Sequence, residues 1–168
     1  MTPLAERLAG KDLLLDTNLL LLLTVGLVRP ESVGGRRLEQ YTLSHFHMLC
    51  ETVISAGRVI LTPHVLAETS NLIKAALYGE PLRNALTVLM LDQLRFGDNS
   101  QSRVVLERPT PKVTLDRNDV YRLGVADAGL LSAAAVERTV LVTADFDLYS
   151  RAMHQGIEAE NFNYVWND

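Results

Sequence analysis

The sequence predicts an α/β fold of three layers, in which helices flank a central parallel sheet. Short strand-like stretches at 12–16, 59–61 and 139–142, each centred on continuous apolar residues, have the length and composition of buried strands. Longer segments with helical patterns separate these runs, and strands that alternate with helices favour parallel pairing with right-handed crossovers. The 168 residues fit one domain with a substantial core, so we expect a single domain over 1–168.

Residues that start or stop helices separate the expected elements. Gly57 ends one helical pattern, and Thr62 followed by Pro63 supplies an N-cap and a proline at the first helical position. Pro109 and Pro111 indicate an exposed connection. In chain order we expect strand 12–16, helix 18–27, helix 38–56, strand 59–61, helix 63–79, helix 81–96, a β-like stretch at 103–107, helices 116–123 and 125–137, strand 139–142, a helix that starts at 143–145, and a last strand near 160–165.

Composition favours a cytoplasmic protein that does not enter a membrane. The lone Cys50 excludes an intrachain disulfide and a metal cluster built from cysteines. Asp16 and Asn18 interrupt the apolar run 13–28, and the part that follows is too short to span a bilayer. The amino terminus also lacks the basic-then-apolar order of a signal peptide.

The net charge of −4 does not decide whether the chain binds nucleic acid. Nucleic-acid binders usually carry a net positive charge. Four acids gathered in one metal pocket would account for the whole net charge of −4, and cations bound there would attract phosphate groups. Arg36 and Arg37 follow two glycines and form a basic loop suited to an RNA backbone. The alternative for either arginine is an ordinary solvated surface charge.

Four acids occupy positions that suggest a shared site. Asp16 and Asp145 each follow an apolar strand, and the carboxyl ends of parallel strands meet at the edge of the sheet where ligands bind. Glu68 lies on the helix after the second strand, and Asp127 lies on the small-residue first turn of an apolar helix. Singly, each acid is explained as an N-cap, a first-turn acid or a solvated charge. Together, such carboxylates can hold hard cations for phosphodiester hydrolysis.

The chain resembles PIN-domain proteins, the nuclease fold of toxin–antitoxin ribonucleases and RNA-processing enzymes. The resemblance covers nearly the whole chain, and its four motifs occur in the family's order. The matching segments are Leu14-Leu15-Asp16-Thr17-Asn18, Pro63-His64-Val65-Leu66-Ala67-Glu68, Asp127-Ala128-Gly129-Leu130-Leu131 and Val142-Thr143-Ala144-Asp145-Phe146-Asp147-Leu148.

The resemblance implies a PIN-like fold and a metal-dependent endoribonuclease that cleaves RNA. In the family, the residues matching Asp16, Glu68, Asp127 and Asp145 bind Mg²⁺ or Mn²⁺ in one pocket. An antitoxin protein and a second copy of the chain, in a homodimer, are the implied protein partners.

Three further residues have supporting roles in this interpretation. Asn18 would hold a ligand water or orient Asp16, and Thr143 matches the hydroxyl residue that precedes the fourth acid. Asp147 is an additional candidate metal ligand, or else a first-turn helix acid that faces solvent. No histidine is assigned to catalysis.

The chain is longer than compact toxins of the family at 29–56 and 80–116. The extended helical region at about 63–96 would form a substrate wall, a dimer face or a partner surface. Two alternatives stay open. One is a catalytically silent PIN domain that binds RNA or protein, and the other is an Asp-nucleophile phosphatase, although that chemistry normally has a second Asp where Asn18 stands.

Overall fold

The fold is α/β, with a parallel sheet between helices, as the sequence predicts. The computed structural model describes residues 1–90, 117–137 and 139–166. Within these ranges the sheet has four strands in the order β2-β1-β3-β4, all parallel. The strands are β1 (Asp12–Leu15), β2 (Arg58–Ile60), β3 (Val140–Thr143) and β4 (Ala159–Asn161).

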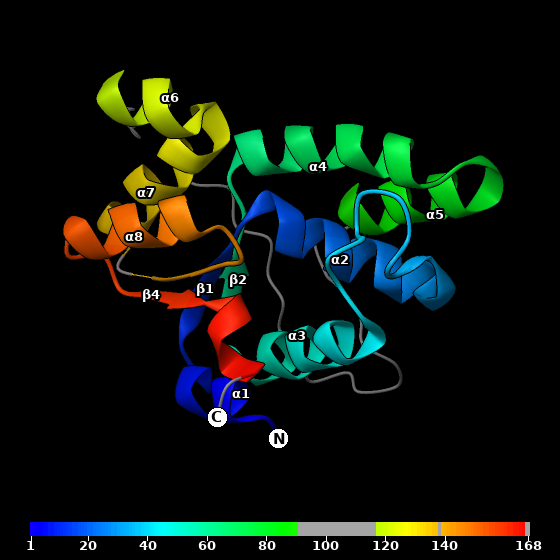
Figure 1. Cartoon of the computed structure of the whole chain (residues 1–168), viewed down its shortest axis with the longest axis horizontal. Helices are drawn as coiled ribbons and strands as arrows, with labels where there is room; N and C mark the ends of the chain where they lie inside the picture. The colour runs from blue at the N-terminus through cyan, green and yellow to red at the C-terminus, as the bar shows by residue number, and fades with distance from the viewer. Residues whose placement is uncertain (91–116, 138, 167–168) are drawn as a thin grey trace.

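Helices lie on both sides of this sheet (Figure 1). The pair α1 and α3 lies on one side, α7 and α8 lie on the other, and α2, α4 and α5 pack together beyond the sheet. The helices are α1 (Pro3–Leu8), α2 (Thr17–Val28), α3 (Leu43–Ser55), α4 (Pro63–Ala76), α5 (Gly79–Met90), α6 (Arg117–Leu123), α7 (Val125–Glu137) and α8 (Phe146–His154), with short 3-10 turns at Pro30–Ser32 and Phe162–Trp166.

The order of the strands reverses direction between β1 and β3. Strand β2, the next strand along the chain, pairs with one edge of β1, and β3 pairs with its other edge. This change of direction leaves a crevice at the carboxyl ends of β1 and β3, which is where open α/β sheets bind ligands. Asp16 directly follows β1 at this point, and its backbone N–H bonds to the carbonyl of Val142 at 3.2 Å.

Helix α2 is apolar all around and is buried accordingly. Its residues from Leu19 to Leu23 are fully buried, as expected for a helix that packs on several neighbours rather than on one. It contacts α3, α4 and α5. At Gly26 the approach is close, because a Cβ there would lie 2.3 Å from the ring of Phe46 on α3. The buried helix α2 therefore holds its N-cap residue, Asp16, in a fixed position.

Several expected boundaries differ from the structure. The helix expected over 38–56 begins only at Leu43, because Thr42 caps it, and Leu38 and Tyr41 are buried from a turn-rich loop instead. The last strand ends at Asn161, whose side chain accepts the N–H of Asn163 and starts a 3-10 turn. The expected β-like stretch 103–107 and the end of helix 81–96 lie outside the described residues.

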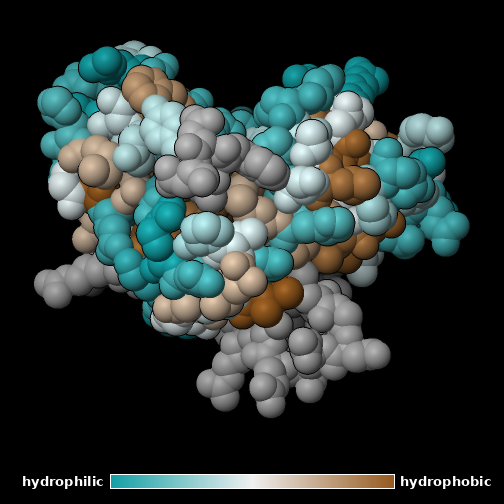
Figure 2. All heavy atoms as spheres, turned by 60° about the horizontal axis from the view of Figure 1, so that its bottom comes forward, coloured by the Kyte–Doolittle hydropathy of each residue, from teal (hydrophilic) through white to brown (hydrophobic). Residues whose placement is uncertain are grey.

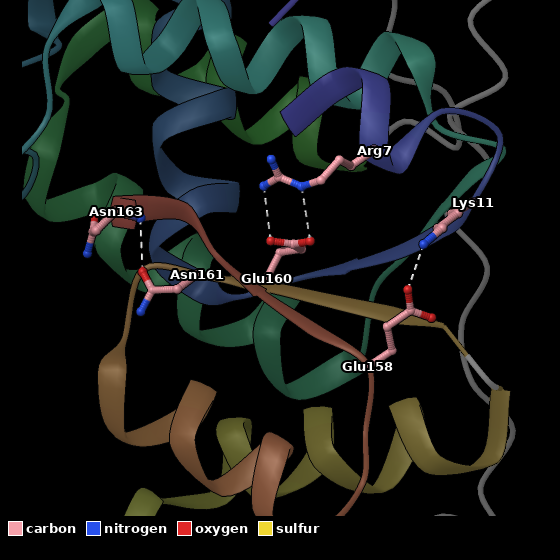
Figure 3. Close-up of polar contacts among 6 residues, drawn as sticks. All are labelled: Arg7, Lys11, Glu158, Glu160, Asn161 and Asn163. Atoms are coloured by element: carbon pink, nitrogen blue, oxygen red, sulfur yellow. Dashed lines mark hydrogen bonds and ion pairs between the residues drawn. The ribbon is translucent and has the colours of Figure 1, made fainter. Parts of the chain in front are cut away.

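Two ion pairs join the amino-terminal segment, helix α1 and the turn after it, to edge strand β4 and the residue before that strand (Figure 3). Arg7 donates to both carboxylate oxygens of Glu160 at 3.2 and 3.4 Å, and Lys11 pairs with Glu158 at 2.6 Å. These pairs are open to solvent, so each contributes little to the free energy of unfolding.

The surface mixes polar and apolar side chains. On the face in Figure 2, hydrophobic residues form separate patches among hydrophilic ones. Among the described helices, none has the length and apolar character needed to cross a bilayer.

Candidate active site

The four acids singled out in the sequence line one pocket of about 160 Å³. They arrive from four separate segments: Asp16 after β1, Glu68 on α4, Asp127 on the first turn of α7 and Asp145 after β3. The rest of the lining consists of Thr17, Asn18, Leu72, Leu123, Gly124, Val125 and Ala126.

Asp16 is the buried member of the group, with 2% of its surface exposed. Its Oδ1 accepts the N–H of Leu19 at 2.7 Å, which caps α2. Its Oδ2 accepts the hydroxyl of Thr143 at 2.5 Å and the N–H of Ala144 at 2.9 Å. Burial raises the pKa of Asp16, the three hydrogen bonds oppose that shift, and the charge of Asp145 adds to it.

Thr143 connects the two acids at the strand ends. While its hydroxyl donates to Asp16, the same oxygen accepts the N–H of Asp145 at 2.9 Å. Asp145 in turn caps α8, because its Oδ1 accepts the N–H groups of Asp147 at 2.7 Å and Leu148 at 3.0 Å. Thr143 therefore contacts the carboxylate of Asp16 and the backbone of Asp145 at the same time.

Asp127 has no charge-compensating partner among the described residues. Burial, and to a smaller extent the negative charges of Asp16, Asp145 and Glu68, together raise its pKa to about 7. No described donor reaches its carboxylate. Asp127 is therefore partly protonated near neutral pH, and a bound cation would favour its charged form.

Thr17 is a site residue that the sequence analysis missed. Its hydroxyl donates to Oε2 of the otherwise exposed Glu68 at 3.2 Å, a contact across 51 residues of sequence. Its position directly after Asp16, in the first turn of α2, is the sequence feature that could have identified Thr17 as a site residue. Asn18 lines the pocket as expected.

Two other groups of expected site residues lie elsewhere. Asp147 is exposed and lines a neighbouring pocket between α6 and α8, not the pocket of the four acids. Arg36 and Arg37 are exposed on the loop before α3, where Arg37 has a φ of 73°, and they are not among the residues that line the acidic pocket.

The pocket has the negative charge and the oxygen donors that a divalent cation requires. Within the described ranges, no three acidic, histidine or cysteine side chains are already arranged around a single ion position. Mg²⁺ does not require such a cage, because it commonly takes one or two carboxylates and keeps several waters. The oxygens of Asp127, and those of Glu68 and Asp145 outside their hydrogen bonds, are the donors best placed for this.

Comparison with known proteins assigns no family. No protein-family model matches the chain, and no curated protein matches it. A solved domain from Methanocaldococcus jannaschii DSM 2661, described as part of a functionally unknown protein, is similar in structure. It is 19% identical, over 90% of this chain and 91% of that chain, with a TM-score of 0.46.

Proposed function

We propose that this protein is a metal-dependent endoribonuclease of the PIN type, which hydrolyses phosphodiester bonds in RNA. The observation that carries the proposal is the convergence of Asp16, Glu68, Asp127 and Asp145 in one pocket at the crevice of the sheet. Burial and the neighbouring negative charges raise the pKa of Asp127, and a pKa perturbed in this way within a pocket supports a functional site where a cation would offset the charge. The order of the four acid motifs along the chain agrees with that family.

Mg²⁺ or Mn²⁺ held by these acids would activate a water molecule and neutralise charge on the phosphate under attack. Asp127, Glu68 and Asp145 present oxygens to the pocket. Asp16 would join them through Oδ1, which accepts a single hydrogen bond, whereas its Oδ2 accepts two.

The chain's own residues hold these groups in place. Thr143 fixes Asp16 and Asp145 relative to each other, and Thr17 holds Glu68 toward the pocket. Such outer hydrogen bonds orient acids around metals and exclude unproductive rotamers. Asn18, on the lining, is placed to hold a water or a phosphate oxygen.

The decisive experiment compares the wild type with Asp127→Asn on single-stranded and structured RNA, with Mn²⁺ and with EDTA. We expect cleavage only by the wild type and only with the metal. Among the described residues, Asp127 caps no helix and makes no hydrogen bond through its side chain, so we expect its replacement by the isosteric amide to leave the fold intact. Equal cleavage by both proteins would reject the proposal.

A small phosphomonoester serves as the second substrate. Its turnover with no RNA cleavage would favour an Asp-nucleophile phosphatase, and metal binding without any turnover would favour a silent binding module. The antitoxin partner, the homodimer and the contact of Arg36 and Arg37 with RNA stay predictions of the family resemblance.

A further inference from the structure

A second pocket, larger than the first, lies between α6 and α8. Its volume is about 370 Å³, and its polar lining comes from Asp119 and Arg122 on α6 and from Asp147, Ser150, Arg151 and His154 on α8. Apart from Leu123, every lining residue carries a charged or hydrogen-bonding side chain. A lining of this kind suits a small anionic or polar group and disfavours an apolar ligand.

Arg151 is held in a fixed orientation within this pocket. Asp119 is 3% exposed, and its Oδ1 accepts the Nε–H of Arg151 at 2.7 Å. Its Oδ2 accepts the side-chain amide of Gln155 at 2.8 Å. The buried carboxylate therefore occupies the Nε side of the guanidinium, and no described residue occupies its two terminal nitrogens. Those nitrogens form the fork with which arginine binds two oxygens of a phosphate.

Arg122 supplies a second cation to the same pocket. It follows Asp119 by three positions, about one turn of α6, and its side chain is exposed. Asp147 opposes the two arginines, whereas the charge of Asp119 is already engaged with Arg151. Ser150 and His154 add hydrogen-bonding groups. The pocket thus offers two guanidinium groups against one uncommitted carboxylate.

The second pocket adjoins the first. Leu123 lines both of them, and Asp147 of the second pocket follows Asp145 of the first by two residues. An RNA strand carries a phosphate at every nucleotide, so a strand that placed one phosphate at the four acids would bring its neighbours to adjoining sites.

We propose that the pocket between α6 and α8 binds a backbone phosphate of single-stranded RNA next to the phosphodiester that is cleaved, with Arg122 and Arg151 as its ligands. This inference rests on the proposed function for the identity of the strand. The alternative is that Arg151 and Asp119 only clamp α6 to α8.

The test measures binding rather than cleavage, by the fluorescence anisotropy of a labelled single-stranded RNA with the full chain in EDTA over a range of salt. We expect R122Q to weaken binding on the order of tenfold, because a hydrogen-bonded charge pair is lost. The slope of log affinity against log salt should fall by about 0.7, the contribution of one phosphate contact on a single strand. The loss should be the same for different RNA sequences.

R83Q is the matched control, since Arg83 is an exposed arginine on α5 and its loss changes the net charge equally. We expect R83Q to leave the affinity and the salt slope unchanged. If R122Q behaves like R83Q, the phosphate site is rejected. If R122Q weakens the binding of DNA with the same sequence but not the binding of RNA, the assignment to RNA is rejected.

R151K separates the phosphate site from a structural clamp. Lysine keeps the charge but cannot hold Asp119 and present a planar fork at once. We expect weaker RNA binding by the folded protein, whose folded fraction is checked by thermal unfolding. A lower melting temperature with unchanged affinity would identify a clamp and overturn the proposal.

These results are independent of the proposed cleavage. RNA binding that depends on Arg122, without cleavage in Mn²⁺, keeps the phosphate site and rejects the nuclease. Cleavage in Mn²⁺ with binding that is indifferent to Arg122 keeps the nuclease and rejects the phosphate site.

Discussion

The hydroxyl of Thr143 donates a hydrogen bond to Oδ2 of Asp16 at 2.5 Å, so a residue of β3 holds the carboxylate that ends β1. The two residues are 127 positions apart in the sequence. Because the same hydroxyl oxygen accepts the backbone N–H of Asp145, one side chain connects the carboxylate of Asp16 to the backbone of Asp145. This relationship joins the stability of the fold to the geometry of the pocket.

Replacement of Thr143 tests that relationship. We expect Thr143→Val to lower the free energy of unfolding by about 1–3 kcal/mol, because the buried Oδ2 of Asp16 loses its strongest neutral donor. RNA cleavage should fall by roughly 10–100-fold, as is typical when an outer partner of a metal ligand is lost. Thr143→Ser keeps the hydroxyl and should restore most of both quantities, measured by chemical denaturation and by initial rates. A valine variant with full activity would contradict the orienting role.

The stability of the metal-free protein should depend on pH through Asp127. Its pKa of about 7 in the folded state lies above the value of 3.8 expected when unfolded. The folded state therefore binds the extra proton between these values, and the free energy of unfolding falls as pH rises from about 4 to 7. Because the side chain is only half-buried, we expect a loss on the order of 1–2 kcal/mol after allowance for solvent screening.

Denaturation in EDTA at several pH values checks this expectation, with Asp127→Asn as the control. The amide cannot ionise, so the difference in stability between the variant and the wild type should grow in favour of the variant as pH rises. A constant difference across this range would show that Asp127 is not the titrating group.

Divalent cations should reverse the repulsion among the acids. We expect Mn²⁺ or Mg²⁺ to raise the melting temperature of the wild type at neutral pH, because a ligand that binds only the folded state adds about 2.7 kcal/mol at 100 times its Kd. Asp127→Asn should lose most of this increase. Differential scanning calorimetry with and without EDTA measures it, and an equal increase in both proteins would place the cation elsewhere.

Two acids close in sequence should differ in their effect on cleavage. We expect Asp145→Asn to reduce the rate by more than the roughly 100-fold that the loss of an outer partner causes, since Asp145 lines the four-acid pocket. Asp147→Asn should reduce it by less than about 10-fold, because Asp147 lines the neighbouring pocket instead. Initial rates at saturating Mn²⁺ compare the two. Equal losses would make Asp147 a metal ligand.

The contact between α2 and α3 should be sensitive to added volume. A Cβ at Gly26 would lie 2.3 Å from the ring of Phe46, so we expect Gly26→Ala to lower the free energy of unfolding by about 1–3 kcal/mol through overpacking. The double variant Gly26→Ala with Phe46→Leu should recover part of the loss relative to Phe46→Leu alone. Urea denaturation of the four proteins gives the coupling energy, and additive effects would exclude the contact as the cause.

The sequence alone predicts the local features of this protein. Apolar runs that end in Asp16 and Asp145 identify β1 and β3, and Thr62 with Pro63 identifies the start of α4, since capping and burial of a strand depend on neighbouring residues. The same runs predict the α/β class. Helical spacing alone placed the start of α3 too early, because the buried Leu38 and Tyr41 lie in a loop that no helical period distinguishes from a helix.

Only the tertiary structure decides which residues meet. The order β2-β1-β3-β4 makes β1 and β3 neighbours, and this pairing brings Thr143 onto Asp16 and gathers four acids from separate segments. Asp147 is two residues beyond Asp145, yet it lines another pocket, because Asp145 is the extended N-cap of α8 whereas Asp147 lies within the helix. Local sequence fixes where each carboxylate stands on its own element, whereas the packing of the elements determines whether their charges share one site.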